Sequence, residues 1–292
     1  GNTTLRSSPV QVGTLTNWKQ VSAGASGVIS AIKTDGTLWL WGYNQYGQLG
    51  LGDITYRSSP VQLGTLANWK QVSAGPAYSS TVAAIKTDGT LWMWGSNSSG
   101  QLGLGDFNDR SSPVQVGSLT GWKQVNVGNS FIAAIKTNGT LWTWGSNTEG
   151  QLGLGNDVGI SSPVQIGTLT NWKQLTTGAR HVAAIKNNGT LWTWGRGYEG
   201  QLGNGIPFLN SSSPIQIGSL TNWKLTGCGG YYTLAVKTDG TLWGWGENIN
   251  GYLGLGATTD RSSPVQVGSL TNWKQVSGGQ DHSVGVTFTD IV

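Results

Sequence analysis

A phrase of about seven residues, SSPVQVG or a close variant, returns six times along the 292-residue chain, about every 50 residues. The prolines that mark it are Pro9, Pro60, Pro113, Pro163, Pro214 and Pro264. A tryptophan–lysine pair follows each copy, and five units then carry the phrase TLWxWG. Self-similarity at a fixed period of this length indicates a repeat architecture, in which each unit buries its apolar surface against its neighbours.

Each unit predicts four short strands, in the order PVQV, WKQVS, VAAIK (residues 182–186) and TLWTW (residues 190–194). The last two strands are joined by Asp-Gly or Asn-Gly, as at Asn188-Gly189. These dipeptides between apolar runs are a strong hairpin signal, because a type I′ turn needs positive φ at both central residues. The proline begins its strand, where a missing N–H matters least.

Four-stranded units repeated around a ring describe a β-propeller. The strands are apolar on both faces, as expected for blades that lie between two others. We therefore expect an all-β, six-bladed propeller formed by residues 1–292 as a single domain. The sixth unit lacks its TLWxWG strand, so we expect residues 9–12 to help close the ring against residues 273–288. A seven-bladed ring and an open fragment remain as alternatives.

The phrases AIKTDGTLWxWGxNxxGQLGLGD and RSSPVQV resemble the regulator of chromosome condensation repeat. The resemblance extends from about Arg6 to Val286, nearly the whole chain. The family usually has seven blades, whereas this chain has six unit starts. The resemblance implies action by protein contact, and the repeats are also similar to those of phage and bacterial surface proteins.

Composition excludes several kinds of site. The single cysteine, Cys228, leaves no intrachain disulfide and no cysteine-based zinc site. The net charge is +4, but all lysines occupy two repeated positions, which indicates the surface of a fold and not a nucleic-acid patch. No apolar run reaches the roughly 18 residues needed for membrane insertion. All 16 tryptophans belong to the repeat, so we expect them to fill the gaps between blades.

Catalysis would need an acid, base or nucleophile placed once, outside the repeat. His181 and His282 occupy one repeat position, where the resembled family commonly has a structural histidine. The three glutamates, Glu149, Glu199 and Glu247, occupy nearly equivalent turns, and equivalent positions in different blades should point away from one shared centre. We therefore predict no enzyme and no cofactor or metal. A carbohydrate-active enzyme is the weakest alternative.

Function in a repeat scaffold is expected where the copies differ. The turns between the WKQVS and VAAIK strands should form a rim around the central channel, with side chains in solvent. The predicted rim residues are Tyr78, Phe131, Arg180, His181, Tyr231, Tyr232 and His282. The loops after GQLGLG form a second candidate face with Tyr56, Phe107 and Phe208.

These features predict a non-catalytic binding scaffold whose variable loops contact a protein or a surface glycan, and no nucleic acid. The alternative is a structural or adhesive module of a virion or cell surface, which predicts an extracellular or virion location. The open edge of the incomplete sixth blade would then allow assembly with a neighbour.

Overall fold

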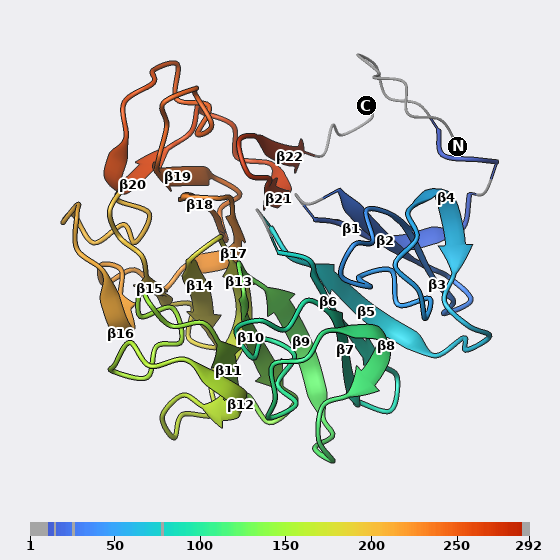
Figure 1. Cartoon of the computed structure of the whole chain (residues 1–292). Helices are drawn as coiled ribbons and strands as arrows, with labels where there is room; N and C mark the ends of the chain where they lie inside the picture. Colours follow the sequence, from blue (N-terminus) through green and yellow to red (C-terminus); the bar gives the residue numbers. More distant parts are fainter. Residues whose placement is uncertain (1–10, 15, 25–26, 77–78, 288–292) are drawn as a thin grey trace.

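From Trp18 onward, strands form where the repeat predicts apolar runs, and the computed structural model arranges them as successive sheets around a ring (Figure 1). The structure describes residues 11–14, 16–24, 27–76 and 79–287. Five sheets have four strands and the sixth has two. The described residues contain 22 strands, no α-helix, and therefore no helix that could span a membrane. The predicted all-β propeller with an incomplete last blade is confirmed.

Strands that occupy the same position in different blades have the same phrase of the repeat as their sequence. The innermost are β1 (Trp18–Ala23), β5 (Trp69–Ala74), β9 (Trp122–Val127), β13 (Trp172–Thr177), β17 (Trp223–Cys228) and β21 (Trp273–Gly278). The second are β2 (Val28–Lys33), β6 (Thr81–Lys86), β10 (Phe131–Lys136), β14 (His181–Lys186), β18 (Tyr232–Lys237) and β22 (Ser283–Thr287). The third are β3 (Leu38–Gly42), β7 (Leu91–Gly95), β11 (Leu141–Gly145), β15 (Leu191–Gly195) and β19 (Leu242–Gly246). The outermost are β4 (Arg57–Gln62), β8 (Arg110–Gln115), β12 (Ile160–Gln165), β16 (Ser211–Gln216) and β20 (Arg261–Gln266).

The SSPVQ strand ends a blade and does not begin one, which corrects the predicted strand order. Trp39 of β3 pairs with Gln62 of β4, so the GQLGLG loop folds the third strand back on the SSPVQ strand of the next repeat. The proline thus lies on the outer edge, where a missing ladder hydrogen bond is tolerated. Of the predicted closing strand, Pro9 and Val10 lie outside the described residues, and Gln11 and Val12 are not in a strand.

Tryptophan packing joins each blade to the one before it. The second tryptophan of LWxWG is fully buried at Trp94, Trp144, Trp194 and Trp245. Each Nε1 donates to a backbone carbonyl in the GQLG loop of the preceding blade, for example from Trp194 to Gln151 at 3.0 Å. The tryptophan of the inner strand meets it edge to face, as in the pair of Trp172 and Trp194, whose ring centroids are 6.1 Å apart. The prediction that tryptophans fill the gaps between blades holds for these rings.

Lysines at the end of the second strand are also part of the core. Lys86, Lys186 and Lys237 are buried although they were expected at the surface. The Nζ atom of Lys186 lies 3.5 Å from the ring centroid of Trp192 and 4.7 Å from that of Trp172. Burial lowers the pKa of Lys186. The cation–π attraction of the tryptophan faces compensates in part for the hydration that the buried ammonium group loses.

Candidate functional site

Both variable loop regions lie on one face of the propeller. Arg196 N, which follows β15, donates to Arg180 O in the β13–β14 turn at 2.9 Å. In the next blade the equivalent hydrogen bond runs from Glu247 N to Tyr231 O, at 3.0 Å. The Asp-Gly hairpins bond instead to the connections that enter the next blade, as Trp69 N does with Gly36 O at 3.0 Å. The rim and the predicted second face are therefore one surface, here called the loop face.

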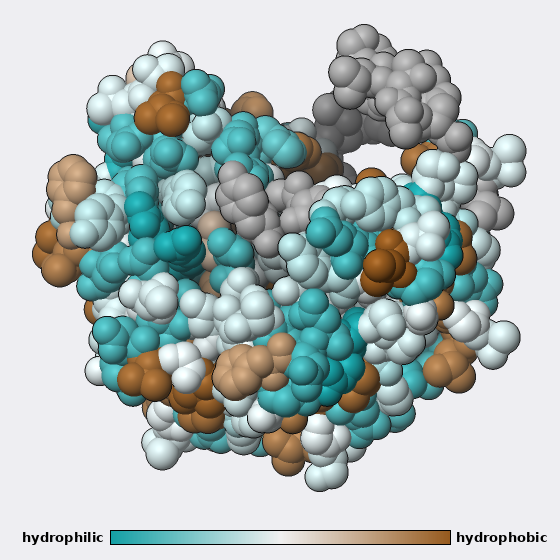
Figure 2. All heavy atoms as spheres, in the orientation of Figure 1, coloured by the Kyte–Doolittle hydropathy of each residue, from teal (hydrophilic) through white to brown (hydrophobic). Residues whose placement is uncertain are grey.

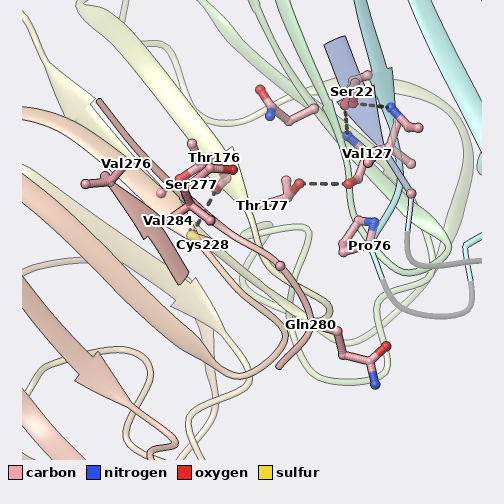
Figure 3. A pocket seen from close by; sticks show the side chains of 18 of the residues that line it. Ser22, Pro76, Val127, Thr176, Thr177, Cys228, Val276, Ser277, Gln280 and Val284 are labelled. Atoms are coloured by element: carbon pink, nitrogen blue, oxygen red, sulfur yellow. Dashed lines mark hydrogen bonds between the residues drawn. The ribbon is translucent and has the colours of Figure 1, made fainter. Parts of the chain in front are cut away.

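A central channel of about 660 Å³ opens between the innermost strands (Figure 3). The fifth residue of each inner strand lines it, which places small side chains there: Ser22, Ser73, Asn126, Thr176, Gly227 and Ser277. Several of these groups hold neighbouring blades together, since Ser22 Oγ accepts from Ala74 N at 3.0 Å. Burial raises the pKa of Cys228 to about 11, so this channel thiol stays protonated near neutral pH and is a poor nucleophile.

Three of the predicted rim side chains are buried, which corrects the prediction that they face solvent. Phe131, His181 and Tyr232 have no exposed surface. Each is the first residue of its strand, and its ring packs inward against a glycine that lies three residues earlier in the chain. A Cβ on Gly178 would overlap the His181 ring, and Gly128 and Gly229 make the same room for Phe131 and Tyr232. The glycine at this spacing is the sequence signal of burial.

The remaining rim residues are spread over different environments. Arg180 keeps 39% of its side chain exposed. Tyr231 is partly buried and His282 is exposed. Tyr78 lies outside the described residues. The predicted rim is therefore not a continuous ring of aromatic side chains in the described part of the chain.

His181 is a structural residue held in its neutral form. Its Nε2 lies 2.9 Å from Thr233 Oγ1, which itself donates to Gln201 O at 2.9 Å. Because the hydroxyl has one hydrogen, it must accept from His181 Nε2–H, and Nδ1 is then the bare nitrogen. Nδ1 is buried without a partner in the described residues. Burial lowers the pKa of His181 to about 4, against the weaker attraction of Glu199.

An arginine–glutamate cluster occupies the loop face at the third and fourth blades. Arg196 Nη1 lies 3.1 Å from Glu149 Oε1, and Arg196 Nη2 lies 2.6 Å from Glu199 Oε1. Arg180 reaches the same Glu149 oxygen at 3.0 Å. Burial alone would raise the pKa of Glu199, but hydrogen bonds from Arg196 and Gln201 outweigh it and hold the pKa below its usual value. The expectation that equivalent glutamates cannot share a centre is wrong, because Arg196 spans two blades.

Two departures from the repeat build this cluster. Gly197 stands where other copies have asparagine, as at Asn147 and Asn248. Asn210 occupies the position of Asp260 in the fifth blade. There the Asp260 carboxylate accepts a hydrogen bond from Asn248 N at 2.7 Å. Asn210 Oδ1 accepts from Gly197 N at 3.0 Å, and its amide donates to Glu149 Oε2 at 2.6 Å. An aspartate there would repel Glu149, so the amide fits the cluster.

Aromatic and aliphatic side chains border the cluster on the fourth blade. The Arg196 guanidinium lies 5.0 Å from the Tyr198 ring centroid and 5.3 Å from that of Tyr231. The Tyr198 and Phe208 rings meet edge to face at 6.3 Å. The exposed members are Tyr198 (47%), Ile206 (52%), Phe208 (73%) and Leu209 (54%). These four residues are called the blade-four patch, and Figure 2 shows hydrophobic surface gathered at the edge of the molecule near the β15–β16 connection.

Phe208 combines exposure with an unusual backbone. Its φ is +63°, in the left-handed region that phenylalanine rarely adopts. A bulky residue kept in such a conformation, while its side chain lies in water, is an observed strain of the kind that gathers at functional sites. Sequence analysis selected Phe208, but it missed Arg196, Tyr198 and Asn210. The only available signal was that this copy departs from the other four at several neighbouring positions.

The other two residues of the predicted second face belong to simpler loops. Tyr56 packs on Tyr43, with ring centroids 4.8 Å apart, and Phe107 is 64% exposed. Arg110 ties the Phe107 loop through a 2.6 Å ion pair with Asp106. The described residues hold no group of histidine, cysteine, aspartate and glutamate that could bind a metal ion.

Comparison with known proteins places this geometry among related propellers. The family model of the RCC1-like domain matches residues 80–291, and that of the regulator of chromosome condensation (RCC1) repeat matches residues 35–82. The ultraviolet-B receptor UVR8 of Arabidopsis thaliana is 39% identical over 111 residues, which are 37% of this chain and 24% of UVR8. The chain thus spans about a quarter of that curated relative.

Solved structures agree over most of the chain. Human WBSCR16 is 25% identical, with a TM-score of 0.83 over 94% of this chain and 73% of that one. Prp20p of Saccharomyces cerevisiae is 20% identical, with a TM-score of 0.79 over 93% of this chain and 69% of its own. The latter structure was described together with the binding of Prp20p to Gsp1p and histones, and its likeness to this chain is one of fold.

Proposed function

The chain belongs to the RCC1-like domain family, and from that premise we propose that it is a non-catalytic scaffold that binds a protein through the loop face at the fourth blade. One observation carries the proposal: the blade-four patch is exposed and apolar, and its copy of the repeat has a loop one residue longer than the others and Gly197 in place of their asparagine. Isolated exposed hydrophobic residues need no explanation, but four on adjoining loops mark an interaction surface.

The neighbouring cluster suits a binding role and not catalysis. Glu149 and Glu199 each accept charged hydrogen bonds from Arg196, so neither is a free general base. The same bonds hold the guanidinium against the Tyr198 and Tyr231 rings. Fixed aromatic and arginine side chains lose little conformational entropy on binding, which is why they dominate protein interfaces. Arg196 therefore acts as the rigid support of the patch.

Relatives favour a protein as the partner. Prp20p binds Gsp1p and histones, so propellers of this fold have served as protein-docking platforms. Nucleic acid is disfavoured because both arginines of the cluster are paired with Glu149. The surface glycan, the adhesive module and the extracellular or virion location stay predictions of the sequence.

The test compares Phe208→Ser/Leu209→Ser with Phe107→Ser as the matched control. Immobilised wild-type and variant chains are incubated with extract of the source cells, and retained proteins are measured by quantitative mass spectrometry. We expect the double variant to lose specific partners at least tenfold, while Phe107→Ser retains them and the melting temperatures stay equal. Equal retention by all three chains would place the binding surface elsewhere.

A further inference from the structure

A cavity of about 280 Å³ lies on the loop face at the second blade, and it is called here the second-blade cavity. One water molecule needs roughly 10–15 Å³, so the cavity has room for the head group of a side chain. Loops of three neighbouring blades form its walls, and every residue that lines it has a polar side-chain group. The cavity is therefore suited to a polar or charged ligand group.

Ser96 in this cavity occupies the repeat position that Arg196 has in the fourth blade. Ser96 N donates to Ser80 O at 2.9 Å. Arg196 N makes the equivalent bond to Arg180 O, also at 2.9 Å, so the backbone follows the same path in both loops. Arg196 fills its place with a guanidinium group, whereas a serine side chain is too short to do so. The second-blade cavity is thus the space that a guanidinium occupies two blades further along.

The other lining residues also correspond to residues around Arg196. Tyr46 N donates to Gln48 Oε1 at 2.9 Å, and Glu149 N donates to Gln151 Oε1 at 2.8 Å in the equivalent turn. The remaining correspondences are Ser98 to Tyr198, Gln101 to Gln201, Ser130 to Tyr231 and Asp109 to Asn210. The second blade therefore has the same frame of loops around its cavity as the arginine–glutamate cluster has around Arg196.

Asp109 supplies the negative charge of the cavity. Its Oδ1 accepts from Asn97 N at 2.7 Å. In the fourth blade Asn210 accepts the equivalent bond through Oδ1, and its Nδ2 reaches across the cluster to Glu149 at 2.6 Å. By this correspondence Asp109 Oδ2 faces the cavity, and within the described part of the chain it has no hydrogen-bond or ion-pair partner. A charged acceptor is therefore available to a ligand.

The acceptors around Asp109 fit a guanidinium group better than an ammonium group. A guanidinium has five N–H donors in one plane and no acceptor, so it needs acceptors on several sides. Serine hydroxyls from two blades and the Tyr46 hydroxyl from a third surround the carboxylate. The neighbouring Arg110 does not fill this role, because its guanidinium pairs with Asp106 at 2.6 Å.

We propose that the second-blade cavity binds an arginine side chain of a partner protein, as the fourth blade holds its own Arg196. The Asp109 carboxylate accepts from the guanidinium, and the serine and tyrosine hydroxyls accept its other N–H groups. This site lies two blades away from the blade-four patch. It is therefore a second contact on the loop face and goes beyond the function proposed above.

The probe is N-acetyl-L-arginine amide, whose guanidinium is its only charged group. The control is N-acetyl-L-citrulline amide, which has nearly the same shape and no charge. Each compound is titrated into the isotopically labelled full chain, and amide chemical shifts report binding. We expect saturable shifts at residues 96–98 and 109, and binding of the citrulline compound that is weaker by about tenfold or more.

Variants of the chain locate the site. Asp109→Asn should weaken binding of the arginine compound by about tenfold or more, because an amide Nδ2 would face the guanidinium with donors. The fold should tolerate this change, since Asn210 keeps the equivalent backbone bond at 3.0 Å. Ser96→Arg should block binding by filling the cavity from within. Asp157→Asn, at an exposed carboxylate outside the cavity, should leave binding unchanged.

Equal binding of the arginine and citrulline compounds would overturn the proposal, and so would unchanged binding by Asp109→Asn and Ser96→Arg. Equal affinity for N-acetyl-L-lysine amide would contradict the preference for a guanidinium. Binding of methyl glucoside at the same amides, without binding of the arginine compound, would make the cavity a sugar site instead. The chain with Phe208→Ser/Leu209→Ser should bind the probe normally, so failure at one site leaves the other proposal untouched.

Discussion

Acid should destabilise the fold through His181, because its neutral form alone fits the site. The side chain is fully buried, Nε2–H is committed to Thr233, and Nδ1 has no partner within the described chain. Protonation would bury a cation without an acceptor, which is costly. The folded-state pKa is about 4, well below the ordinary value of 6.5.

The sign and size follow from proton linkage. Below pH 6.5 the unfolded chain takes up a proton that the folded chain refuses until about pH 4, so stability present above pH 6.5 is lost as the pH falls. With these two pKa values the free energy of unfolding should drop by about 2 kcal/mol between pH 7 and pH 5. Urea denaturation followed by tryptophan fluorescence at several pH values measures this difference.

The control is His181→Phe, because Phe131 occupies the equivalent position above the equivalent glycine. Thr233 keeps its bond to Gln201 O in that variant, so little other hydrogen bonding is lost. The difference in pH dependence between wild type and variant isolates His181 from the carboxylates that also titrate. If the two curves run parallel from pH 7 to pH 5, the buried imidazole is not the cause and the derivation is wrong.

Three further changes test the packing. Trp144→Ala should lower the free energy of unfolding by about 3–5 kcal/mol in urea, because a fully buried ring and its bond to Gln101 O are removed. Lys186→Ala should lower the free energy of unfolding by about 1–2 kcal/mol, because the Lys186 Nζ lies over the Trp192 ring. The control Lys173→Ala, at an exposed lysine, should lower it by less than about 0.5 kcal/mol. Equal losses of stability would contradict the cation–π assignment. Gly178→Ala should lower the melting temperature by displacing the His181 ring, and a neutral result would show that the ring can move aside.

Sequence periodicity was sufficient for the architecture. A phrase repeated about every 50 residues gives each unit the same local structure, and the Asp-Gly and Asn-Gly dipeptides correctly placed the hairpins. The type I′ turn expected there is wrong, because only the glycine has a positive φ, as at Gly36 (+82°), and the residue before it does not. The burial of Trp144 and its equivalents could be predicted because repeated large apolar residues have nowhere else to pack. The strand pairing of the SSPVQ phrase could not, since the sequence does not say whether a strand closes its own unit or the preceding one.

Tertiary structure decided the functional surface. His181, Phe131 and Tyr232 look like loop residues in the sequence, but a glycine three residues earlier lets each ring turn inward. Arg196 joins Glu149 and Glu199 although these lie about 50 residues apart, because the ring brings neighbouring blades within reach of one side chain. Local sequence determines strands and turns, since their interactions are short-range. Which side chains meet across blades depends on how the sheets pack, and that is set only when the ring forms.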